Sequence, residues 1–338
     1  MTLPANLETS WIPLVSLKSL KNRPIKRILG SVPIVIWRSG NDILAAKDRC
    51  PHRNYPLSEG RIKAGKLVCA YHGWEFSHQH KCTQIPGSCP NSKFDKYGLE
   101  KIETRVLYDA VFVCLKPKSQ SDDEIIAGLP PIPNDQDFDF FWWELKPSKA
   151  RVYDALDNVL DPFHTNFIHD GFIRVSHKRQ KVSQIIETRE NSFSVTYLQD
   201  ADYGLMSKAL EGPRTKSTGS YYPPISFQGR WDGPKGLNLC VTIWFVPESA
   251  NSTRSIIRFS MAKHRGPKWF KEAMIRLFLI KVIEQDADAL KALSDNIETF
   301  GAPSFKSGPD DRLSAKLTTL FSGNKLIRET LGPYEIWL

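Results

Sequence analysis

The chain has 338 residues, of which 41 % are hydrophobic and 25 % are charged, and its formal net charge is +9. A chain of this length is expected to form two domains. No apolar run reaches the roughly 18 residues that a transmembrane helix needs, so we predict no membrane span. The first residues lack a basic region followed by an apolar stretch, and six cysteines do not suggest a disulfide scaffold. We therefore expect a cytoplasmic protein with free thiols.

The first third of the chain contains short strand patterns separated by turns. Residues 25–30 and 32–37 predict a hairpin with its turn at Gly30, and residues 42–46 predict a third strand. A loosely alternating stretch at 106–115 predicts the strand that closes this part. The pattern is typical of a small all-β unit with loops at one end.

Two cysteine–histidine pairs interrupt this β-rich part, namely Cys50-Pro-His52 and Cys69-Ala-Tyr-His72. Two thiolates on one iron and two imidazoles on the other hold a [2Fe-2S] cluster of the Rieske type. A structural zinc site also uses two Cys and two His, but it usually pairs Cys with Cys and His with His. The mixed pairs favour the cluster, and zinc is the alternative metal.

Residues 117–133 are polar and contain paired prolines, so they predict a linker. The part beyond it contains strand-like stretches and then a long helix from Lys268 to about Phe300. The strands are expected at residues 140–145, 182–198, 219–231, 237–246 and 254–261. Strands followed by a helix that packs across them form an α+β layer.

A helix is expected from about Tyr153, and it carries Asp161, His164 and His169. Asp161 and His164 are three positions apart and share a face of a helix. His164 and His169 are about 140° apart on an ideal helix, so both reach one metal only if the helix breaks or bulges between them. Two imidazoles and one carboxylate form the open site of a mononuclear Fe(II) oxygenase. We predict that His164 and His169 supply the imidazoles.

Three stretches together resemble the Rieske non-heme iron oxygenases. They are CPHRNYPLSEG from Cys50, LVCAYHGWEF from Leu67, and the pattern N-x-x-D-x-x-H-x-x-x-x-H from Asn158. Rieske proteins of the cytochrome bc complexes carry an additional cysteine in each cluster loop, where this chain has Tyr55 and Tyr71. The oxygenase type is therefore the better match.

The resemblance implies a fold and its boundaries. An all-β Rieske module is expected at residues 1–118. A helix-grip (START-like) catalytic domain, with an antiparallel sheet and a long C-terminal helix, is expected at residues 119–338. The fold class is α+β.

The resemblance also implies the roles of the site residues. Cys50, His52, Cys69 and His72 would hold the cluster, and His164 and His169 would bind the mononuclear iron. The third iron ligand would be Asp286 on the long helix, with Glu284 and Asp288 as alternatives. Asn158 is a further candidate near the iron. Asp161 would bridge His72 of a neighbouring subunit to His164.

The implied activity is hydroxylation or oxidative demethylation of a small organic substrate with O2. Electrons would come from NAD(P)H through a separate reductase or ferredoxin, and the chain would form a homotrimer. The alternative is a Rieske electron-transfer protein without mononuclear iron. Aromatic residues suggest a pocket for an apolar or planar molecule. The candidates are Phe163, Phe167 and some of Tyr221, Tyr222, Phe227, Trp231 and Trp244.

The positive charge of the chain is concentrated near the expected cluster. Nucleic-acid binding is one explanation, but the cluster favours docking of an acidic ferredoxin or reductase. The basic residues are Lys18, Lys21, Arg23, Lys26, Arg27, Arg53, Arg61, Lys63, Lys66 and Lys81.

Overall fold

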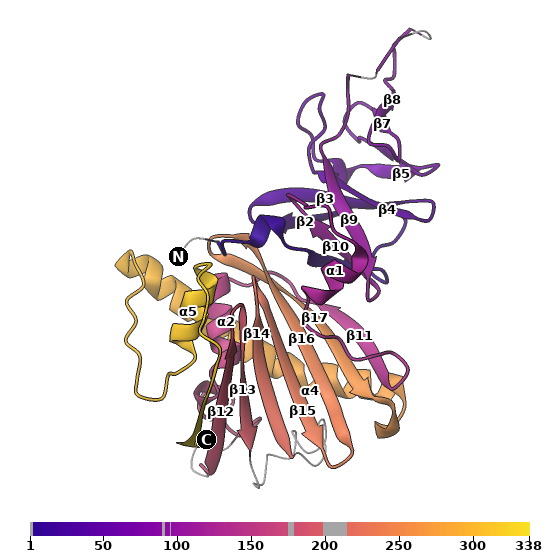
Figure 1. The fold of residues 1–338 in the computed structure, drawn as a ribbon. Coiled ribbons are helices and arrows are strands. Elements are labelled where there is room, and N and C mark those ends of the chain that lie inside the picture. The colour runs from indigo at the N-terminus through magenta and orange to yellow at the C-terminus, as the bar shows by residue number, and fades with distance from the viewer. Residues whose placement is uncertain (1–2, 90–91, 95, 175–178, 199–214) are drawn as a thin grey trace. The chain divides into compact units, whose positions relative to one another are not determined.

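The computed structural model describes residues 3–89, 92–94, 96–174, 179–198 and 215–338. It divides into two compact units, which Figure 1 shows as ribbons. One comprises Glu8–Ser121 with Val246–Ser249, and the other comprises Met1–Leu7, Asp122–Phe245 and Ala250–Leu338. The predicted domain boundary after residue 118 stays a prediction. Among the described residues, no helix has the length and apolar character needed to cross a membrane.

The unit that begins at Glu8 contains a six-stranded sheet. Its spatial order is β1 (Ile12–Ser16), β10 (Ala110–Cys114), β9 (Lys101–Leu107), β4 (Asp42–Lys47), β3 (Val32–Ser39) and β2 (Ile25–Leu29). The predicted hairpin is confirmed, because β2 and β3 pair antiparallel from Leu29 and Val32 outward. Its turn residues Gly30 and Ser31 both have positive φ, 58° and 73°. Such a turn matches the twist of the strands it joins.

A smaller four-stranded sheet supports the two cysteine–histidine loops. Its order is β5 (Arg61–Lys63), β6 (Lys66–Val68), β7 (Glu75–Phe76) and β8 (Cys82–Gln84). The first loop lies between β4 and the 3-10 turn η2 (Leu57–Glu59), and the second lies between β6 and β7. Trp37, Leu57, Leu67 and Phe76 form part of the buried core beneath both loops. Apolar packing therefore fixes where the loops begin and end.

The single strand predicted at residues 106–115 is wrong, because the structure has the hairpin β9–β10 there. Tyr108 and Asp109 form its turn with φ values of 52° and 60°. A tyrosine in the left-handed region is uncommon, so the sequence carries no turn signal there.

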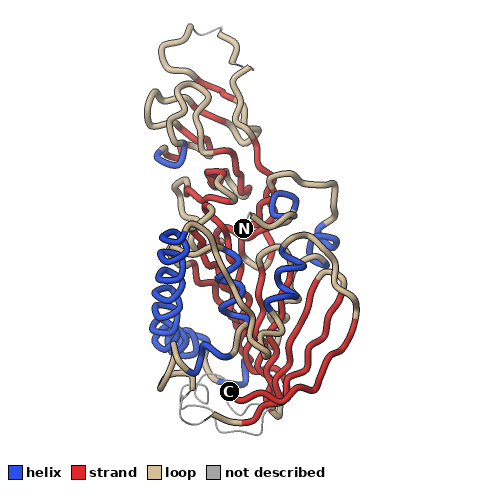
Figure 2. The backbone as a smooth tube through the Cα atoms, turned by 90° about the vertical axis from the view of Figure 1, so that its left-hand side faces the viewer, coloured by secondary structure: helices blue, strands red, loops and turns tan. Residues whose placement is uncertain are grey.

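The other unit is built on an eight-stranded antiparallel sheet. Its order is β11 (Phe138–Glu144), β17 (Ser252–Ala262), β16 (Gly236–Ser249), β15 (Ser226–Gly233), β14 (Lys216–Tyr222), β13 (Ser192–Leu198), β12 (Lys181–Arg189) and β18 (Glu329–Trp337). The predicted long helix is confirmed as α4 (Lys268–Phe300). Figures 1 and 2 show α4 running across one face of the sheet. Ile275 of α4 packs there against Phe141, Leu239, Val241 and Phe259.

Several segments differ from the sequence prediction. The stretch 182–198 is the hairpin β12–β13 rather than one strand. The linker contains the short helix α1 (Asp122–Ala127), whose first turn is acidic and therefore suits a helix N-terminus. The helix α5 (Ser314–Phe321) and the edge strand β18 were not predicted. Other 3-10 turns lie at Leu7–Thr9 and Lys263–Arg265.

The predicted iron helix is shorter than expected. It is α2 (Val152–Leu160), followed by the 3-10 turn η3 (Phe163–Asn166). Asp161 has ψ 120° because the next residue is Pro162, and a residue before proline is disfavoured in the helical region. Asp161 and His164 therefore do not share a helix. The predicted break between His164 and His169 is also present, because η3 ends at Asn166.

Candidate metal centres and substrate pocket

The two cysteine–histidine loops have matching backbone geometry. The N–H of Cys50 donates to the carbonyl of Tyr55, and the N–H of Cys69 donates to the carbonyl of Trp74, both at 2.9 Å. Each loop then turns through a residue with positive φ, Asn54 at 59° and Gly73 at 72°. Two loops of the same shape present one thiol and one imidazole each, as a cluster with unlike iron atoms requires.

The four donor side chains lie close together. Cys50 and Cys69 are buried, and the rings of His52 and His72 have centroids 4.5 Å apart. Nδ1 of His52 is buried and has no hydrogen-bond partner, which fits a nitrogen that binds metal. Burial and the neighbouring Cys69 raise the pKa of the Cys50 thiol to about 11, so a bound metal would be needed to hold it as a thiolate. These observations fit a [2Fe-2S] cluster.

Aromatic rings enclose the donor side chains. His52 stacks on Trp74 with centroids 4.7 Å apart. Tyr55 and Tyr71, the positions compared above with additional cysteines, are ring neighbours with centroids 5.4 Å apart. The two loops are therefore in contact through aromatic packing at this point.

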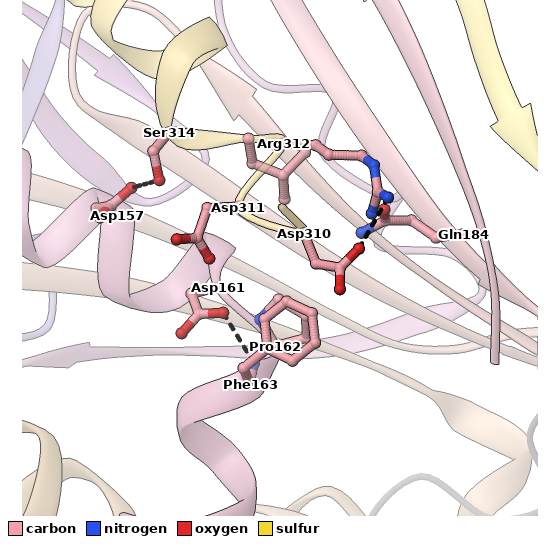
Figure 3. A pocket seen from close by; sticks show the side chains of 10 residues that line it. Asp157, Asp161, Pro162, Phe163, Gln184, Asp310, Asp311, Arg312 and Ser314 are labelled. Carbon is pink, nitrogen blue, oxygen red and sulfur yellow. Dashed lines mark hydrogen bonds and ion pairs between the residues drawn. The ribbon is translucent and has the colours of Figure 1, made fainter. Parts of the chain in front are cut away.

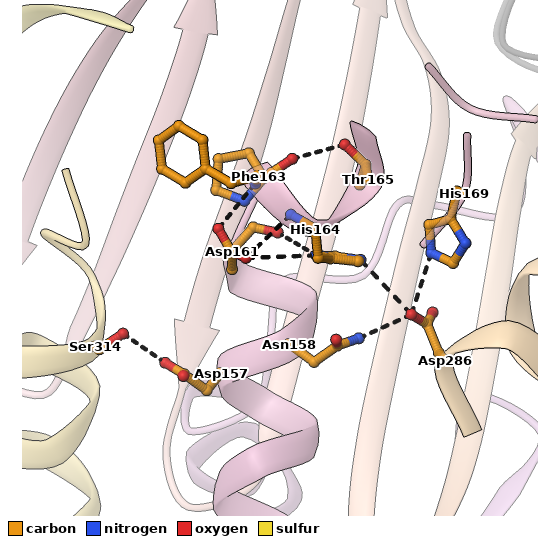
Figure 4. Close-up of polar contacts among 10 residues, drawn as sticks. Asp157, Asn158, Asp161, Phe163, His164, Thr165, His169, Asp286 and Ser314 are labelled. Carbon is orange, nitrogen blue, oxygen red and sulfur yellow. Dashed lines mark hydrogen bonds and ion pairs between the residues drawn. The ribbon is translucent and has the colours of Figure 1, made fainter. Parts of the chain in front are cut away.

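His164, His169 and Asp286 converge on one point, as Figure 4 shows. Their donor atoms all lie within 4.8 Å of one another, and no other group of three His, Cys or acidic side chains in the described part of the chain does so. Oδ1 of Asp286 lies 3.1 Å from Nε2 of His169 and 3.6 Å from Nε2 of His164. Two imidazoles and one carboxylate on one side of a point suit a ferrous ion with open positions.

Two amides orient the converging side chains. Nδ2 of Asn158 donates to Oδ1 of Asp286 at 3.1 Å, so Asn158 is a partner of the carboxylate. Nδ1 of His169 lies 3.1 Å from Oε1 of Gln285, which leaves Nε2 directed at Asp286. The alternatives Glu284 and Asp288 are exposed and lie outside the group. Sequence reasoning missed Gln285, although it directly precedes Asp286.

Charge at this group also favours a cation. Burial is the largest single influence on His169 and lowers its pKa, but the hydrogen bond to Asp286, the charge of Asp286 and the hydrogen bond to Gln285 together raise the pKa overall. The carboxylate of Asp286 therefore favours positive charge at this point.

A mostly apolar cavity of about 240 Å³ adjoins His164. Residues from α2, η3, α4 and the sheet line it, including Leu160, Val195, Phe227, Trp231 and Leu279. Of the predicted aromatic lining, Phe227 and Trp231 are present. Tyr221 and Trp244 are buried in the core instead, and Phe167 is 62 % exposed. The lining favours an apolar substrate.

Two glycines shape the floor of this cavity. Gly219 of β14 and Gly229 of β15 are directly opposite each other in the sheet. A Cβ on Gly229 would lie 2.6 Å from the ring of Trp231, and one on Gly219 would lie 3.3 Å from the ring of Phe227. The missing side chains therefore let both rings lie over the strands.

Two family models match the chain in order. One, described as the Rieske [2Fe-2S] domain, matches residues 10–98. The other, described as the vanillate O-demethylase oxygenase C-terminal domain, matches residues 149–316. The second match includes both histidines and Asp286.

Curated relatives match over most of this chain. Protein TIC 55, chloroplastic, of Arabidopsis thaliana is 28 % identical over 84 % of this chain and 53 % of its own length. The 4beta-methylsterol monooxygenase of Methylococcus capsulatus is 23 % identical over 86 % of this chain and 81 % of its own length. This chain spans about half the length of the TIC 55 proteins that it matches.

The fold also matches a solved structure. The structure of NdmA of Pseudomonas putida with caffeine has a TM-score of 0.73 and 18 % identity, covering 93 % of this chain and 90 % of that one. With the two family models matched in order along one chain, the protein belongs to the Rieske non-heme iron oxygenases, whose cofactors are a [2Fe-2S] cluster and a mononuclear iron.

Proposed function

We propose that this chain is an oxygenase that hydroxylates or oxidatively demethylates a small apolar organic substrate. The convergence of His164, His169 and Asp286 beside an apolar cavity carries the proposal. When bound there, iron activates O2 and the Rieske cluster supplies electrons one at a time. A pure electron carrier would need the cluster donors but would have no use for the second group.

The side chains of this unit have distinct tasks in the proposed reaction. Gln285 and Asn158 hold His169 and Asp286 in the orientation that a metal requires. The apolar walls, with Trp231 and Phe227, exclude water and place the substrate beside His164. Substrate atoms near His164 would then be the ones oxidised.

The names of the relatives support a substrate class. The matched proteins include a methylsterol monooxygenase and a structure that contains caffeine, and a matched family model is named for an O-demethylase. We infer an apolar or planar ring compound for this chain, with a methyl or ring carbon as the point of attack.

Electrons would arrive from NAD(P)H through a separate ferredoxin or reductase that docks on the basic surface around the cluster. Within the enzyme they would pass from His72 of one chain to Asp161 of a neighbouring chain, and then to His164. Such a path needs at least two copies, and a homotrimer would close the arrangement. We place the protein in the cytoplasm, although some relatives carry chloroplastic names.

The test is substrate-dependent NADH consumption over a panel of methylated aromatic and polycyclic compounds, with ¹⁸O₂ and mass spectrometry of products. Incorporation of ¹⁸O into a product, or into the released one-carbon fragment, supports the proposal. A protein that binds only the two cluster irons and never consumes O2 with substrate would instead be the electron carrier.

A further inference from the structure

The apolar cavity beside His164 contains a hydroxyl group that the protein itself does not satisfy. Among the described residues that line this cavity, only Tyr197 has a buried polar side-chain atom without a hydrogen-bond partner, its hydroxyl oxygen. The lining threonines are paired, because Thr165 donates to the carbonyl of Pro162 at 2.6 Å and Thr218 bonds to Thr196 at 3.2 Å. A buried hydroxyl without a partner costs free energy, so it points to an occupant of the cavity.

The side chain of Tyr197 lies on the cavity face of the sheet. Tyr197 of β13 is directly opposite Ser217 of β14, and Ser217 is directly opposite Trp231 of β15. Directly opposed residues of antiparallel strands share one face of a sheet, and all three of these residues line the cavity. Tyr197 and Ser217 therefore form the polar end of a row that continues with the ring of Trp231.

The ring of Tyr197 has a structural role, but its hydroxyl does not. The ring packs against Val182, Ile336 and Leu338, and a phenylalanine would make the same contacts. Burial raises the pKa of the hydroxyl, and the side chain of Gln184 on the neighbouring strand lowers it less, although no hydrogen bond joins the two groups. Packing alone therefore does not account for a hydroxyl at this position.

The surroundings of Tyr197 disfavour an anion. Burial raises the pKa of its hydroxyl and the charge of Asp161 raises it further, so a negative charge is unfavourable there. Asp161 also lines a second cavity, of about 200 Å³ (Figure 3), whose other carboxylates are those of Asp157, Asp310 and Asp311. In the apolar cavity the formal charges of Asp161 and Arg174 cancel. The group that meets Tyr197 is therefore uncharged.

We propose that Tyr197 anchors the substrate by donating a hydrogen bond to an uncharged oxygen, a hydroxyl or a carbonyl, of an otherwise apolar ring compound. The inference rests on the proposed function, because it takes the apolar cavity as the substrate site of the oxygenase. His164 lines the same cavity, so a substrate held at Tyr197 presents a defined carbon toward His164. Tyr197 thereby sets both the substrate class and the position that is oxidised.

The experiment compares the wild type with Tyr197→Phe, which keeps the ring and removes only the hydroxyl. The probes are methylnaphthol, methylnaphthaldehyde, dimethylnaphthalene and methylnaphthoate, all substituted at the same two ring positions. Isothermal titration calorimetry with the full chain, loaded with cluster and iron, gives each Kd. We expect Tyr197→Phe to weaken binding of the naphthol, the naphthaldehyde or both at least about fivefold and to leave dimethylnaphthalene unchanged. The probe that loses affinity identifies the oxygen group, and the naphthoate should bind both proteins most weakly.

Thermal unfolding separates a substrate anchor from a structural hydroxyl. Tyr197→Phe should not lower the melting temperature of the substrate-free protein, because it removes a hydroxyl that has no partner. Tyr221→Phe is the matched control in the neighbouring strand β14, since the hydroxyl of Tyr221 donates to the carbonyl of Pro224 at 3.0 Å. The control should lower the melting temperature and leave probe binding unchanged.

Several results would overturn the anchor. They are equal effects of Tyr197→Phe on all four probes, no effect on any, tightest binding of the naphthoate, or a wild type that binds none of them. A melting temperature lowered as in Tyr221→Phe would show that the hydroxyl is structural. Incorporation of ¹⁸O is measured separately, so an active oxygenase whose probe binding ignores Tyr197 refutes only the anchor. Binding that depends on the hydroxyl, with no ¹⁸O in any product, would refute only the oxygenase.

Discussion

Nδ1 of His164 lies 2.7 Å from the backbone carbonyl oxygen of Asp161, whereas the carboxylate of Asp161 is 3.8 Å from the same nitrogen. That carboxylate instead accepts the backbone N–H groups of Phe163, at 2.8 Å, and His164, at 3.2 Å. The main chain therefore orients the imidazole. The side chain of Asp161 also lines a second cavity, together with Asp157, Asp310 and Asp311.

The contacts of Asp161 predict how Asp161→Asn should behave. The variant keeps the carbonyl that orients His164, and its amide oxygen still accepts a backbone N–H, so cluster and iron should both remain. Electron transfer between them should slow severely, because an amide lacks the charge that a bridging residue uses to hold histidine N–H groups. A single-turnover experiment that follows cluster reoxidation with substrate and O2 measures this.

Two outcomes would contradict the role of Asp161. Reoxidation and product formation at the wild-type rate would refute the bridge. Loss of iron would identify Asp161 as a ligand and reopen the assignment of Asp286.

His164→Ala, His169→Ala and Asp286→Ala should each lose the mononuclear iron and all turnover while retaining the cluster. Metal analysis should fall from about three to about two iron ions per chain, because three protein donors are the minimum for this site. Glu284→Ala and Asp288→Ala are the matched controls on the same helix. Iron loss in either control, with retention in Asp286→Ala, would show that the carboxylate is wrongly assigned.

Gln285→Ala should weaken iron binding about 10–100-fold without abolishing it, because the amide orients His169 rather than binding the metal. Competition with a chelator gives the affinity. Gln285→Glu, which retains an acceptor for Nδ1, should lose less than Gln285→Ala. Equal loss of iron affinity in the two variants would show that the 3.1 Å hydrogen bond to His169 does not explain the effect of Gln285.

His52→Ala or Cys69→Ala should remove the visible absorption of the cluster and lower the melting temperature of the unit that contains it. Metal binding supplies much of the folding free energy of a small metal site. Cys82→Ala is the control, since Cys82 is equally buried but lies in β8 outside the loops. An intact brown protein in either cluster variant would refute the cluster assignment.

The cysteines and histidines that bind metal could be predicted from the sequence, because they form short local motifs in which the donors lie only a few residues apart. Asp286 lies more than a hundred positions from His164, and only the resemblance to a family pointed to it. The three-residue spacing of Asp161 and His164 predicts a shared helix face, but Pro162 between them ends the helix at Leu160. The hydrogen bond between His164 and the Asp161 carbonyl depends on backbone angles, which a residue pattern does not predict.

Other features left little trace in the sequence. The strand β18 contains Gly332 and Pro333 and is largely exposed, so it lacks the alternation that marks a strand. The aromatic residues illustrate a second limit. Tyr221 and Trp244 in the core have the same residue character as Phe227 and Trp231 in the pocket, so residue type alone does not distinguish the two sets.

The opposed glycines Gly219 and Gly229 imply how this scaffold changes its substrate range. One methyl group on Gly229 would collide with the ring of Trp231 and tilt it, which reshapes the cavity without touching any donor of iron. The side chains that would bind iron lie on η3, the turn after it and α4, whereas the shape of the cavity is set by positions in the sheet. Single small substitutions in the sheet can therefore change which substrates fit, while the side chains that would bind iron stay unchanged.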